Sequence, residues 1–402
     1  MKQKLLMIAE LIPYPSNSGG KLRTINMLKQ LAYKYDIDYI SYAQTPMTTE
    51  QFDYMKRYCN NVYVYPGGKP SLLKHFWFLL LGRSGIACAI HSREMQKQVN
   101  LLYKDNRYAW IWVERLYCMQ YVQKLFRCGK PNVVLNMHDV DHESIQAFYR
   151  ATTNWVRQMY YKIEYRRVLK LEERSFAQAC RLIACSERDQ TVYTTRFPFS
   201  TDRWLVANNG VDLDQIGVQA TTQRDAATVL FIGSLDYLCN QEGIVWFLNE
   251  IWDKTLALRP DARCVIAGSG AVPDALKQAL ARSTNVDFLG YVDDAYSLFR
   301  QATCLAVPLK SGSGTRLKIL EALSLSLPVV STTIGAEGLL AVDGKEIIIA
   351  DEPEQYAISL ARILNDEALR VKLAMNGKRL VKEHYNWREI MIPLISELEK
   401  SQ

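Results

Sequence analysis

Glycine, hydroxyl and cationic residues gather in PLKSGSGTRLKILEALSLSLPVVSTTIGAEGL, which runs from residue 308 to 339. The side chains that could do chemistry here are Gly312, Ser313, Gly314, Thr315, Arg316, Lys318 and Glu321. Glycines let the backbone approach a ligand closely. Backbone N–H groups at a helix N-terminus, next to an Arg and a Lys, suit a diphosphate. The Glu lies further along the same predicted helix, where its carboxylate accepts hydrogen bonds from a sugar hydroxyl. This spacing predicts a nucleotide-sugar site.

A second group of polar side chains, HDVDHE, occupies residues 138–143 and follows a predicted strand. An imidazole at the carboxyl end of a strand is well placed for chemistry, and His138 is the candidate for contacting a transferred sugar or an acceptor hydroxyl. We expect His142 and Glu143 to cap the next helix or to face solvent. A metal site built from His138, Asp139, Asp141 and His142 is the weaker interpretation, because these ligands would point in too many directions.

Gly19 and Gly20 come soon after the first predicted strand, and Lys21 and Arg23 open the helix that follows. One interpretation is a loop that passes close to a ligand. The alternative is a plain strand-to-helix turn.

Strand-like and helix-like segments alternate along the whole chain, and the pattern restarts after Trp204. The predicted strands are 5–9, 38–42, 62–65, 109–113, 133–137 and 182–184, then 229–232, 264–267, 286–288, 304–307, 329–331 and 347–349. Long helices are predicted over 21–35 and 154–179. Such alternation predicts parallel sheets covered by helices. Two series predict two Rossmann-like domains with ligands at the carboxyl ends of the strands, between the domains.

The composition is that of a globular enzyme. The chain has 402 residues, of which 49% are hydrophobic and 23% charged, and its net charge is +7. This length favours two domains over one core. The nine cysteines show no metal or redox spacing, which indicates reduced thiols in a cytoplasm. The apolar N-terminus is interrupted by Glu10 and Pro13, so we expect a first strand there and not a signal peptide.

Two segments bear on membrane contact. The run LLKHFWFLLL at 72–81 is too short to span a bilayer, and it is either a core helix or an interfacial anchor. The predicted helix 154–179 is rich in Arg and Lys, which either form a solvated face balanced by Glu164, Glu172 and Glu173 or meet an anionic membrane. The charge excess is too small and too dispersed to favour nucleic acid.

Several motifs in order resemble those of one enzyme family. They are PYPSNSGGKLRTINML (13–28), ANNGVDLD (207–214), VLFIGSLDY (229–237), FLGYVDDAYSLF (288–299) and the segment 308–339. Together they resemble the retaining glycosyltransferases of family 4, in the branch of bacterial exopolysaccharide and lipopolysaccharide assembly. The resemblance implies an α/β protein of the GT-B fold, with two Rossmann-like parallel-sheet domains facing across a cleft. It places an acceptor domain at 1–205, a donor domain at 206–383 and a helix crossing back to the first domain at 384–402.

The resemblance also implies roles for individual residues. The catalytic residues that it implies are His138, Arg316 and Lys318. The residues that it implies for binding the donor are Gly20, Gly233, Ser234, Gly290, Tyr291, Val292, Gly312, Ser313, Gly314, Thr315 and Glu321. On the acceptor side it implies Gly19, Lys21 and Arg23. The implied reaction moves a sugar from a nucleotide-diphosphate sugar to a saccharide or a lipid-linked glycan, with retention of configuration. It needs no metal and no further cofactor, and it would take place in the cytoplasm, either free or at the inner face of the cell membrane.

The chain departs from the family pattern in two places. The family's second Glu, eight residues before the ribose-binding Glu, is replaced by Ser313. The family's Arg and Lys after the first strand of the donor domain are also missing, since GSLDYLCNQEG at 233–243 holds no basic residue. Losing two cations would cost a diphosphate site several kcal/mol unless other side chains replace them. We predict that Arg316 and Lys318 do so. The alternative is an inactive or partner-dependent homologue.

A nicotinamide-dependent dehydrogenase is a further alternative, suggested by VIAGSGAVPDAL at 265–276. Gly268 and Gly270 fit the first two glycines of the dinucleotide fingerprint. Pro273 occupies the third position, and no acidic residue follows at the distance that ribose binding requires. The sequence therefore disfavours this class.

Overall fold

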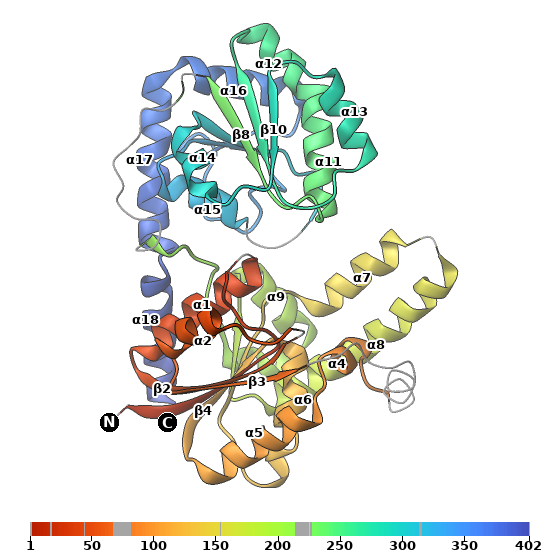
Figure 1. Cartoon of the computed structure of the whole chain (residues 1–402), viewed down its shortest axis with the longest axis vertical. Coiled ribbons are helices and arrows are strands. Elements are labelled where there is room, and N and C mark those ends of the chain that lie inside the picture. Colours follow the sequence, from red (N-terminus) through yellow and green to blue (C-terminus); the bar gives the residue numbers. More distant parts are fainter. Residues whose placement is uncertain are drawn as a thin grey trace. The chain divides into compact units, whose positions relative to one another are not determined.

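The structure is a computed structural model that describes residues 2–16, 18–43, 45–66, 82–152, 154–213, 225, 227–312 and 316–401 (Figure 1). The chain divides into two units. Unit 1 consists of Met1–Asn208 and Met391–Gln402, and unit 2 consists of Asn209–Ile390.

Unit 1 is built on a seven-stranded sheet in which every neighbouring pair is parallel. Its strands are β1 (Gln3–Ala9), β2 (Tyr35–Ala43), β3 (Asn61–Pro66), β4 (Tyr108–Glu114), β5 (Val133–Asn136), β6 (Arg181–Ala184) and β7 (Trp204–Val206). They lie in the order β3-β2-β1-β4-β5-β6-β7. The inner strands are apolar along nearly their whole length, as strands buried on both faces must be.

Helices pack against this sheet and connect its strands. They are α1 (Gly19–Ala32), α2 (Thr49–Lys56), α4 (Gly85–Ala89), α5 (Arg93–Asp105), η1 (Leu116–Cys118), α6 (Met119–Val122), η2 (Leu125–Arg127), α7 (Asp141–Ala151), α8 (Trp155–Gln178), α9 (Glu187–Arg196), η3 (Pro198–Arg203) and the end of α18 (Trp387–Lys400). One apolar core joins α5, α8 and α9 to the strands, with Val99, Phe176 and Tyr193 among its buried members.

Unit 2 repeats the same plan with a six-stranded parallel sheet in the order β10-β9-β8-β11-β12-β13. Its strands are β8 (Thr228–Ile232), β9 (Arg263–Ala267), β10 (Val286–Gly290), β11 (Cys304–Val307), β12 (Val329–Ser331) and β13 (Ile348–Ile349). Its helices are α11 (Leu238–Trp246), the π-helical η4 (Phe247–Trp252), α12 (Asp253–Leu258), α13 (Asp274–Arg282), α14 (Ala295–Gln301), α15 (Leu317–Ser324), α16 (Pro353–Asn365), α17 (Glu367–His384) and the start of α18.

Each strand predicted from the sequence has a counterpart within a few residues of its expected ends, and the prediction of two Rossmann-like parallel-sheet domains is confirmed. The three-residue strand β7 was missed. No described helix is long and apolar enough to cross a bilayer. The segment 72–81 lies outside the described residues.

The expectation that acidic residues balance the charge on the surface of helix α8 is wrong in part. Glu164 and Glu172 are fully buried, while Glu173 is exposed. Glu164 accepts a hydrogen bond from Ser84, and Glu172 lies 2.9 Å from Nδ1 of His142. His142 is also buried, so of the two expectations for it, capping the next helix or facing solvent, the second is wrong.

Candidate active site

The sheet order of each unit fixes where a ligand site belongs. In unit 1 the chain leaves β1 toward β2 on one side and returns to β4 on the other. In unit 2 the same reversal separates β8 from β11. Loops leaving two such strands in opposite directions open a crevice at their carboxyl ends, which is where ligands bind in open α/β sheets.

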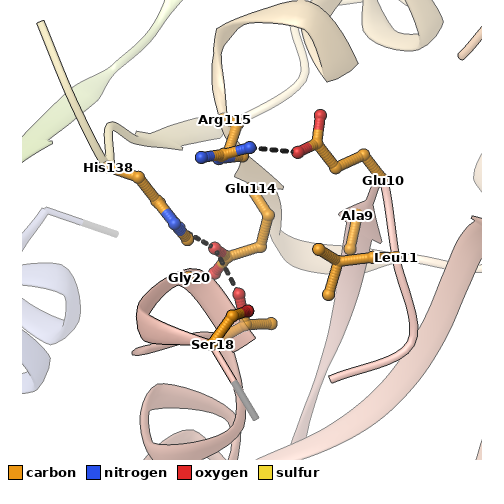
Figure 2. A pocket seen from close by; sticks show the side chains of 9 residues that line it. Ala9, Glu10, Leu11, Ser18, Gly20, Glu114, Arg115 and His138 are labelled. Atoms are coloured by element: carbon orange, nitrogen blue, oxygen red, sulfur yellow. Dashed lines mark hydrogen bonds and ion pairs between the residues drawn. The ribbon is translucent and has the colours of Figure 1, made fainter. Parts of the chain in front are cut away.

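A pocket of about 220 Å³ lies at this reversal point in unit 1 (Figure 2). Residues after β1, at the start of α1, and after β4 and β5 line it: Ala9, Glu10, Leu11, Ser18, Gly20, Thr24, Glu114, Arg115 and His138. Gly19 and Gly20 are thus the first turn of helix α1, not a separate loop. Gly20 leaves room beside His138, because a Cβ at this position would lie 3.5 Å from the imidazole Nδ1.

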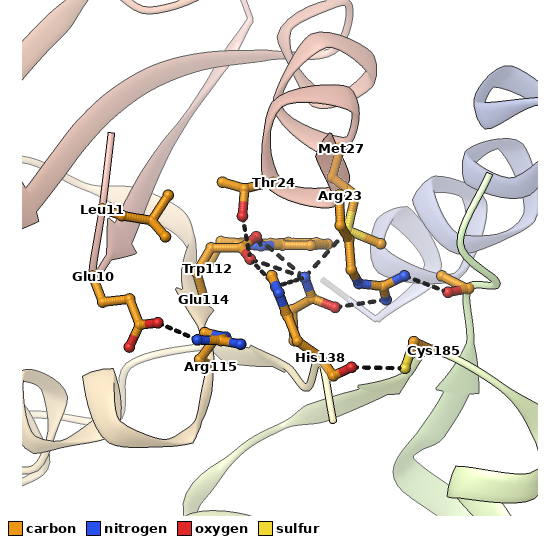
Figure 3. A network of polar contacts seen from close by, with 12 residues as sticks. Glu10, Leu11, Arg23, Thr24, Met27, Trp112, Glu114, Arg115, His138 and Cys185 are labelled. Atoms are coloured by element: carbon orange, nitrogen blue, oxygen red, sulfur yellow. Dashed lines mark hydrogen bonds and ion pairs between the residues drawn. The ribbon is translucent and has the colours of Figure 1, made fainter. Parts of the chain in front are cut away.

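Glu114 is the centre of the polar network beneath this pocket (Figure 3). Its buried carboxylate lies 2.6 Å from Nε2 of His138 and accepts a 2.6 Å hydrogen bond from Nε1 of Trp112. Nδ2 of Asn136 donates to it at 3.1 Å, and Oγ1 of Thr24 at 3.2 Å. A carboxylate that receives this many donors stays ionised: burial raises the pKa of Glu114, but His138, Trp112 and Arg23 outweigh burial and lower it.

The same network sets the protonation of His138. Burial lowers the pKa of His138 and outweighs the neighbouring Glu114 carboxylate, which raises it. The ring is therefore neutral at pH 7. An ionised carboxylate only accepts hydrogen bonds, so Nε2 carries the proton and Nδ1 is left as an acceptor. Nδ1 has no hydrogen-bond partner among the described residues, and this arrangement suits it to accept a hydrogen bond from a hydroxyl.

The acceptor-side prediction for Arg23 is corrected by its position. Arg23 is buried, and its guanidinium donates to the backbone oxygen of Ala207 at 2.7 Å and to Oδ1 of Asn136 at 2.9 Å. It holds the network in place and does not line the pocket. Lys21 is partly exposed at the start of α1 and is not among the residues lining the pocket.

Three charged residues that line the pocket, Glu10, Glu114 and Arg115, were not predicted from the sequence. Arg115 forms an ion pair with Glu10 and a second one with Asp139 at 3.2 Å. Its backbone has a φ of 69°, which is unfavourable for a side chain other than glycine, asparagine or aspartate. Glu114 and Arg115 directly follow the predicted strand 109–113, and this position was the available signal.

In unit 2, the predicted site residues Lys318 and Gly233 come together at the reversal point, beside Asn240. Lys318 on α15 donates to Oδ1 of Asn240 at 3.0 Å, and its ammonium lies 2.6 Å from where a Cβ on Gly233 would be. Gly233 directly follows β8. The absence of a side chain at Gly233 therefore lets Lys318 reach the end of β8, where the motif GSLDYLCNQEG itself supplies no cation.

Lys318 and Glu321 perturb each other's protonation. Burial, reinforced by the nearby Arg316, lowers the pKa of Lys318 to about 7. Burial raises the pKa of Glu321 to about 7, against a 3.3 Å hydrogen bond from the hydroxyl of Tyr296 and the charge of Lys318. Titratable groups whose pKa values are shifted by burial and by specific partners are typical of functional sites.

Gly312 and Arg316 also lie close together. A Cβ on Gly312 would be 3.1 Å from a terminal nitrogen of Arg316 and 2.9 Å from Sγ of Cys239, and its φ of 105° favours glycine. Arg316 is buried and occupies the N-cap position of α15, where its side chain makes no capping hydrogen bond. Ser313, Gly314 and Thr315 lie outside the described residues.

The remaining donor residues lie on neighbouring loops of unit 2. Gly290 ends β10 with a φ of 65°, Tyr291 after it is largely exposed, and Val292 is partly exposed. Ser234 is exposed and its backbone oxygen accepts from Nδ2 of Asn240 at 2.9 Å. Among the described residues, no group of three or more His, Cys, Asp or Glu side chains is arranged to hold a metal ion.

The glycines that suggested a dinucleotide fingerprint have packing reasons. A Cβ on Gly268 would lie 1.9 Å from the backbone oxygen of Gly233, and the Gly268 N–H donates to the oxygen of Gly290 at 2.8 Å. Gly270, with a φ of 114°, packs against Asp236. Both glycines therefore connect the loops of the unit 2 site to each other.

Part of unit 2 resembles a known protein family. Residues 226–366 match the model of the family Glycosyl transferases group 1. A Klebsiella pneumoniae protein described as an uncharacterized 44.6 kDa protein in the cps region is 22% identical over 98% of this chain and 99% of its own length. The phosphatidyl-myo-inositol mannosyltransferase of Mycobacterium tuberculosis is 28% identical over 44% of this chain and 49% of its own length.

Solved structures share the architecture of the whole chain. The Anabaena protein Alr3699/HepE in complex with UDP has a TM-score of 0.69 at 15% identity, covering 99% of this chain and 100% of its own. WaaG, a glycosyltransferase involved in lipopolysaccharide biosynthesis, has a TM-score of 0.63 at 15% identity, covering 98% of both chains. At this identity the likeness establishes the fold, which is GT-B.

Proposed function

We propose that this protein is a glycosyltransferase that moves a sugar from a nucleotide-diphosphate sugar to a hydroxyl acceptor with retention of anomeric configuration. The observation that carries the proposal is the arrangement on α15, where Lys318 lies beside the end of β8 and Glu321, one turn further along, accepts a hydrogen bond from Tyr296. A cation beside a strand end suits a diphosphate, and a carboxylate one turn further along the helix suits the ribose hydroxyls. The family match covers this segment.

The proposed role of unit 2 is to bind the donor and to stabilise its leaving group. Arg316 and Lys318 neutralise the charge that grows on the diphosphate as the glycosyl–phosphate bond breaks. Together they replace the cations that the loop after β8 lacks. Gly290, Tyr291 and Val292 offer backbone groups to the nucleobase, and Gly312–Thr315 offer backbone N–H groups to the phosphates.

The proposed role of unit 1 is to position the acceptor. The neutral His138 accepts a hydrogen bond at Nδ1 from a sugar hydroxyl, and Glu114 fixes the orientation and tautomer of the ring. The acceptor hydroxyl attacks on the same face from which the diphosphate leaves, and the diphosphate takes its proton. Retention follows from this front-face geometry, and the acceptor is a saccharide or a lipid-linked glycan.

The cytoplasm is the proposed compartment. All nine cysteines lie among the described residues and none forms a disulfide. A reducing compartment is consistent with free thiols.

Removing the guanidinium of Arg316 tests the proposal. Wild type and Arg316→Ala are first compared by thermal shift with UDP, GDP, dTDP, ADP and CMP, with and without a divalent metal. A nucleotide present at a hundredfold over its Kd stabilises the wild type by about 2.7 kcal/mol. Donor-sugar hydrolysis or transfer is then followed with the nucleotide that binds. We expect Arg316→Ala to raise the donor KM or to abolish turnover, and wild-type kinetics in this variant would refute the assigned role.

An inactive or partner-dependent homologue is the second candidate, favoured by Ser313 in place of the family's Glu. Nucleotide binding without hydrolysis or transfer would support this candidate. If no nucleotide in the panel binds, the proposed function is wrong.

A further inference from the structure

Helices α7 and α8 form a hairpin that projects from the rest of unit 1 (Figure 1). Its base is fixed by buried polar contacts, such as that between His142 on α7 and Glu172 on α8. The rings of Phe148 and Tyr161 stack with centroids 5.8 Å apart, which ties the two helices together near the free end. The hairpin is therefore an ordered element and not a loose loop.

The free end of this hairpin exposes large apolar side chains. Trp155 is 75% exposed, Met159 53% and Ile163 42%, and these residues are spaced four apart on α8. Residues at this spacing share one helix face. Phe148 on α7, which is 55% exposed, adds an aromatic ring at the same end. A row of apolar side chains in water on one face of a helix marks an interaction surface.

All charged side chains near this free end, which we call the α7–α8 tip, are positive. The twenty residues from Ser144 to Ile163 contain three cations, Arg150, Arg157 and Lys162, and no Asp or Glu. Further along α8, the exposed Arg166 and Lys170 continue the face of Trp155 and Met159 at helical spacing. The face thus changes from apolar at the tip to basic toward the body of unit 1.

We propose that the α7–α8 tip inserts into the interface of an anionic phospholipid bilayer. Trp and Met side chains enter the boundary between headgroups and acyl chains, while Lys and Arg extend their charged ends to the headgroup phosphates. Both signals are needed, because neither a few apolar side chains nor a few cations alone gives stable attachment. The proposal does not depend on the transferase reaction, since it concerns only unit 1 and a lipid surface.

Sedimentation with vesicles tests the proposal. The full-length protein is mixed with vesicles of equal parts phosphatidylglycerol and phosphatidylcholine, and separately with pure phosphatidylcholine. We expect binding to the anionic vesicles and little to the neutral ones. The apolar variant W155S/M159S and the charge variant R150Q/R157Q/K162Q should each weaken binding to anionic vesicles by about tenfold or more.

Matched changes elsewhere provide the control. Tyr33 is 75% exposed on unit 1 and Met375 is 69% exposed on unit 2, so Y33S/M375S removes similar exposed apolar side chains. This variant should bind vesicles like the wild type. The thermal unfolding temperature of each variant without vesicles separates a loss of lipid binding from a loss of folding.

Three results would overturn the proposal. The first is equal binding to both vesicle types or no binding to either. The second is wild-type binding by both tip variants, which would place the lipid contact elsewhere. The third is a wild-type dimer, seen by size exclusion, that W155S/M159S converts to a monomer, which would make the tip a contact between copies of this chain.

Discussion

At the scale of single residues, buried charges decide what the candidate site can do. Glu114 accepts hydrogen bonds from three side chains besides its contact with His138, and buried Arg23 reaches it through Asn136. A buried carboxylate of this kind is costly to remove, because its donors lose their partner inside the protein and the nearby Arg23 guanidinium loses a compensating charge. The imidazole also loses the group that fixes its tautomer.

Glu114→Ala should therefore destabilise unit 1 by about 3 to 5 kcal/mol. Thermal and urea unfolding of the variant and the wild type measure this loss. Glu173→Ala is the control, because Glu173 is exposed on α8 and its removal should change stability by less than about 0.5 kcal/mol. Equal stability of Glu114→Ala and wild type would show that the network contributes little.

The protonation states of the two titratable side chains on α15, Lys318 and Glu321, predict a pH optimum for donor binding. Lys318 and Glu321 both have a pKa of about 7, the first lowered and the second raised by burial. Below pH 7 Glu321 becomes neutral and a poorer acceptor for ribose hydroxyls. Above pH 7 Lys318 loses its charge, so binding a diphosphate requires proton uptake, and Kd should rise by up to about tenfold per pH unit.

Calorimetry measures this profile, with the diphosphate sugar of whichever nucleotide binds in the panel, because the diphosphate of such a sugar does not titrate near pH 7. We expect affinity to be greatest near pH 7. Lys318→Gln should abolish the alkaline limb alone and Glu321→Gln the acidic limb alone. A flat profile in the wild type would contradict both shifted pKa values.

At the scale of elements, the loops around β8 pack so closely that glycine is required. Gly268→Ala would bring a Cβ to within 1.9 Å of the Gly233 oxygen, which is backbone and cannot move aside cheaply. At Gly338, by contrast, an added Cβ would have no neighbour within 4 Å, so the only cost of Gly338→Ala is the backbone strain from a φ of 79°. Gly338→Ala should cost about 1 to 2 kcal/mol. Gly268→Ala should cost more and should also weaken nucleotide binding, as thermal shift with and without UDP would reveal; equal effects of the two variants would refute the packing argument.

Periodicity explains which elements could be predicted. Apolar runs such as VLFI at 229–232 and CLAV at 304–307 are buried on both faces and were recognised as strands of a parallel sheet. The strand β7 has only the residues WLV and was missed. The pattern of apolar residues along the sequence predicts only local structure. A strand of three residues is too short to show such a pattern, and β7 forms only because it pairs with β6.

The same limit applies to the site. The α15 residues could be predicted because they lie close together in the sequence. The partners of His138 could not be, because Glu114 precedes it by 24 residues and meets it only through the pairing of β4 with β5. Arg23 was placed on the acceptor side because the family resemblance implied that role. Its spacing of four from the buried Met27 was the overlooked sign that it faces inward.

At the scale of the whole molecule, the last residues of the chain belong to the unit in which the chain begins. Residues 391–402 are part of unit 1. Within it, Arg181 pairs with Glu397 at 3.2 Å and Lys34 pairs with Glu399 at 3.2 Å. These ion pairs are partly exposed and contribute little. The apolar face of α18 must therefore supply most of the attachment.

Leu398 and Ile392 lie on different faces of α18, one buried and one exposed. Leu398 is fully buried, whereas Ile392 is largely exposed. Leu398→Ala leaves a cavity in unit 1 and should lower its free energy of unfolding by about 2 to 5 kcal/mol. Ile392→Ala, on the same helix, should change it by less than about 0.5 kcal/mol. Thermal unfolding of both variants tests this. It is measured with a saturating concentration of the nucleotide that the panel identifies, because a ligand that stabilises unit 2 leaves the loss in unit 1 visible. If the two variants unfold alike, the end of α18 does not hold unit 1 together, and its last turns only extend the chain.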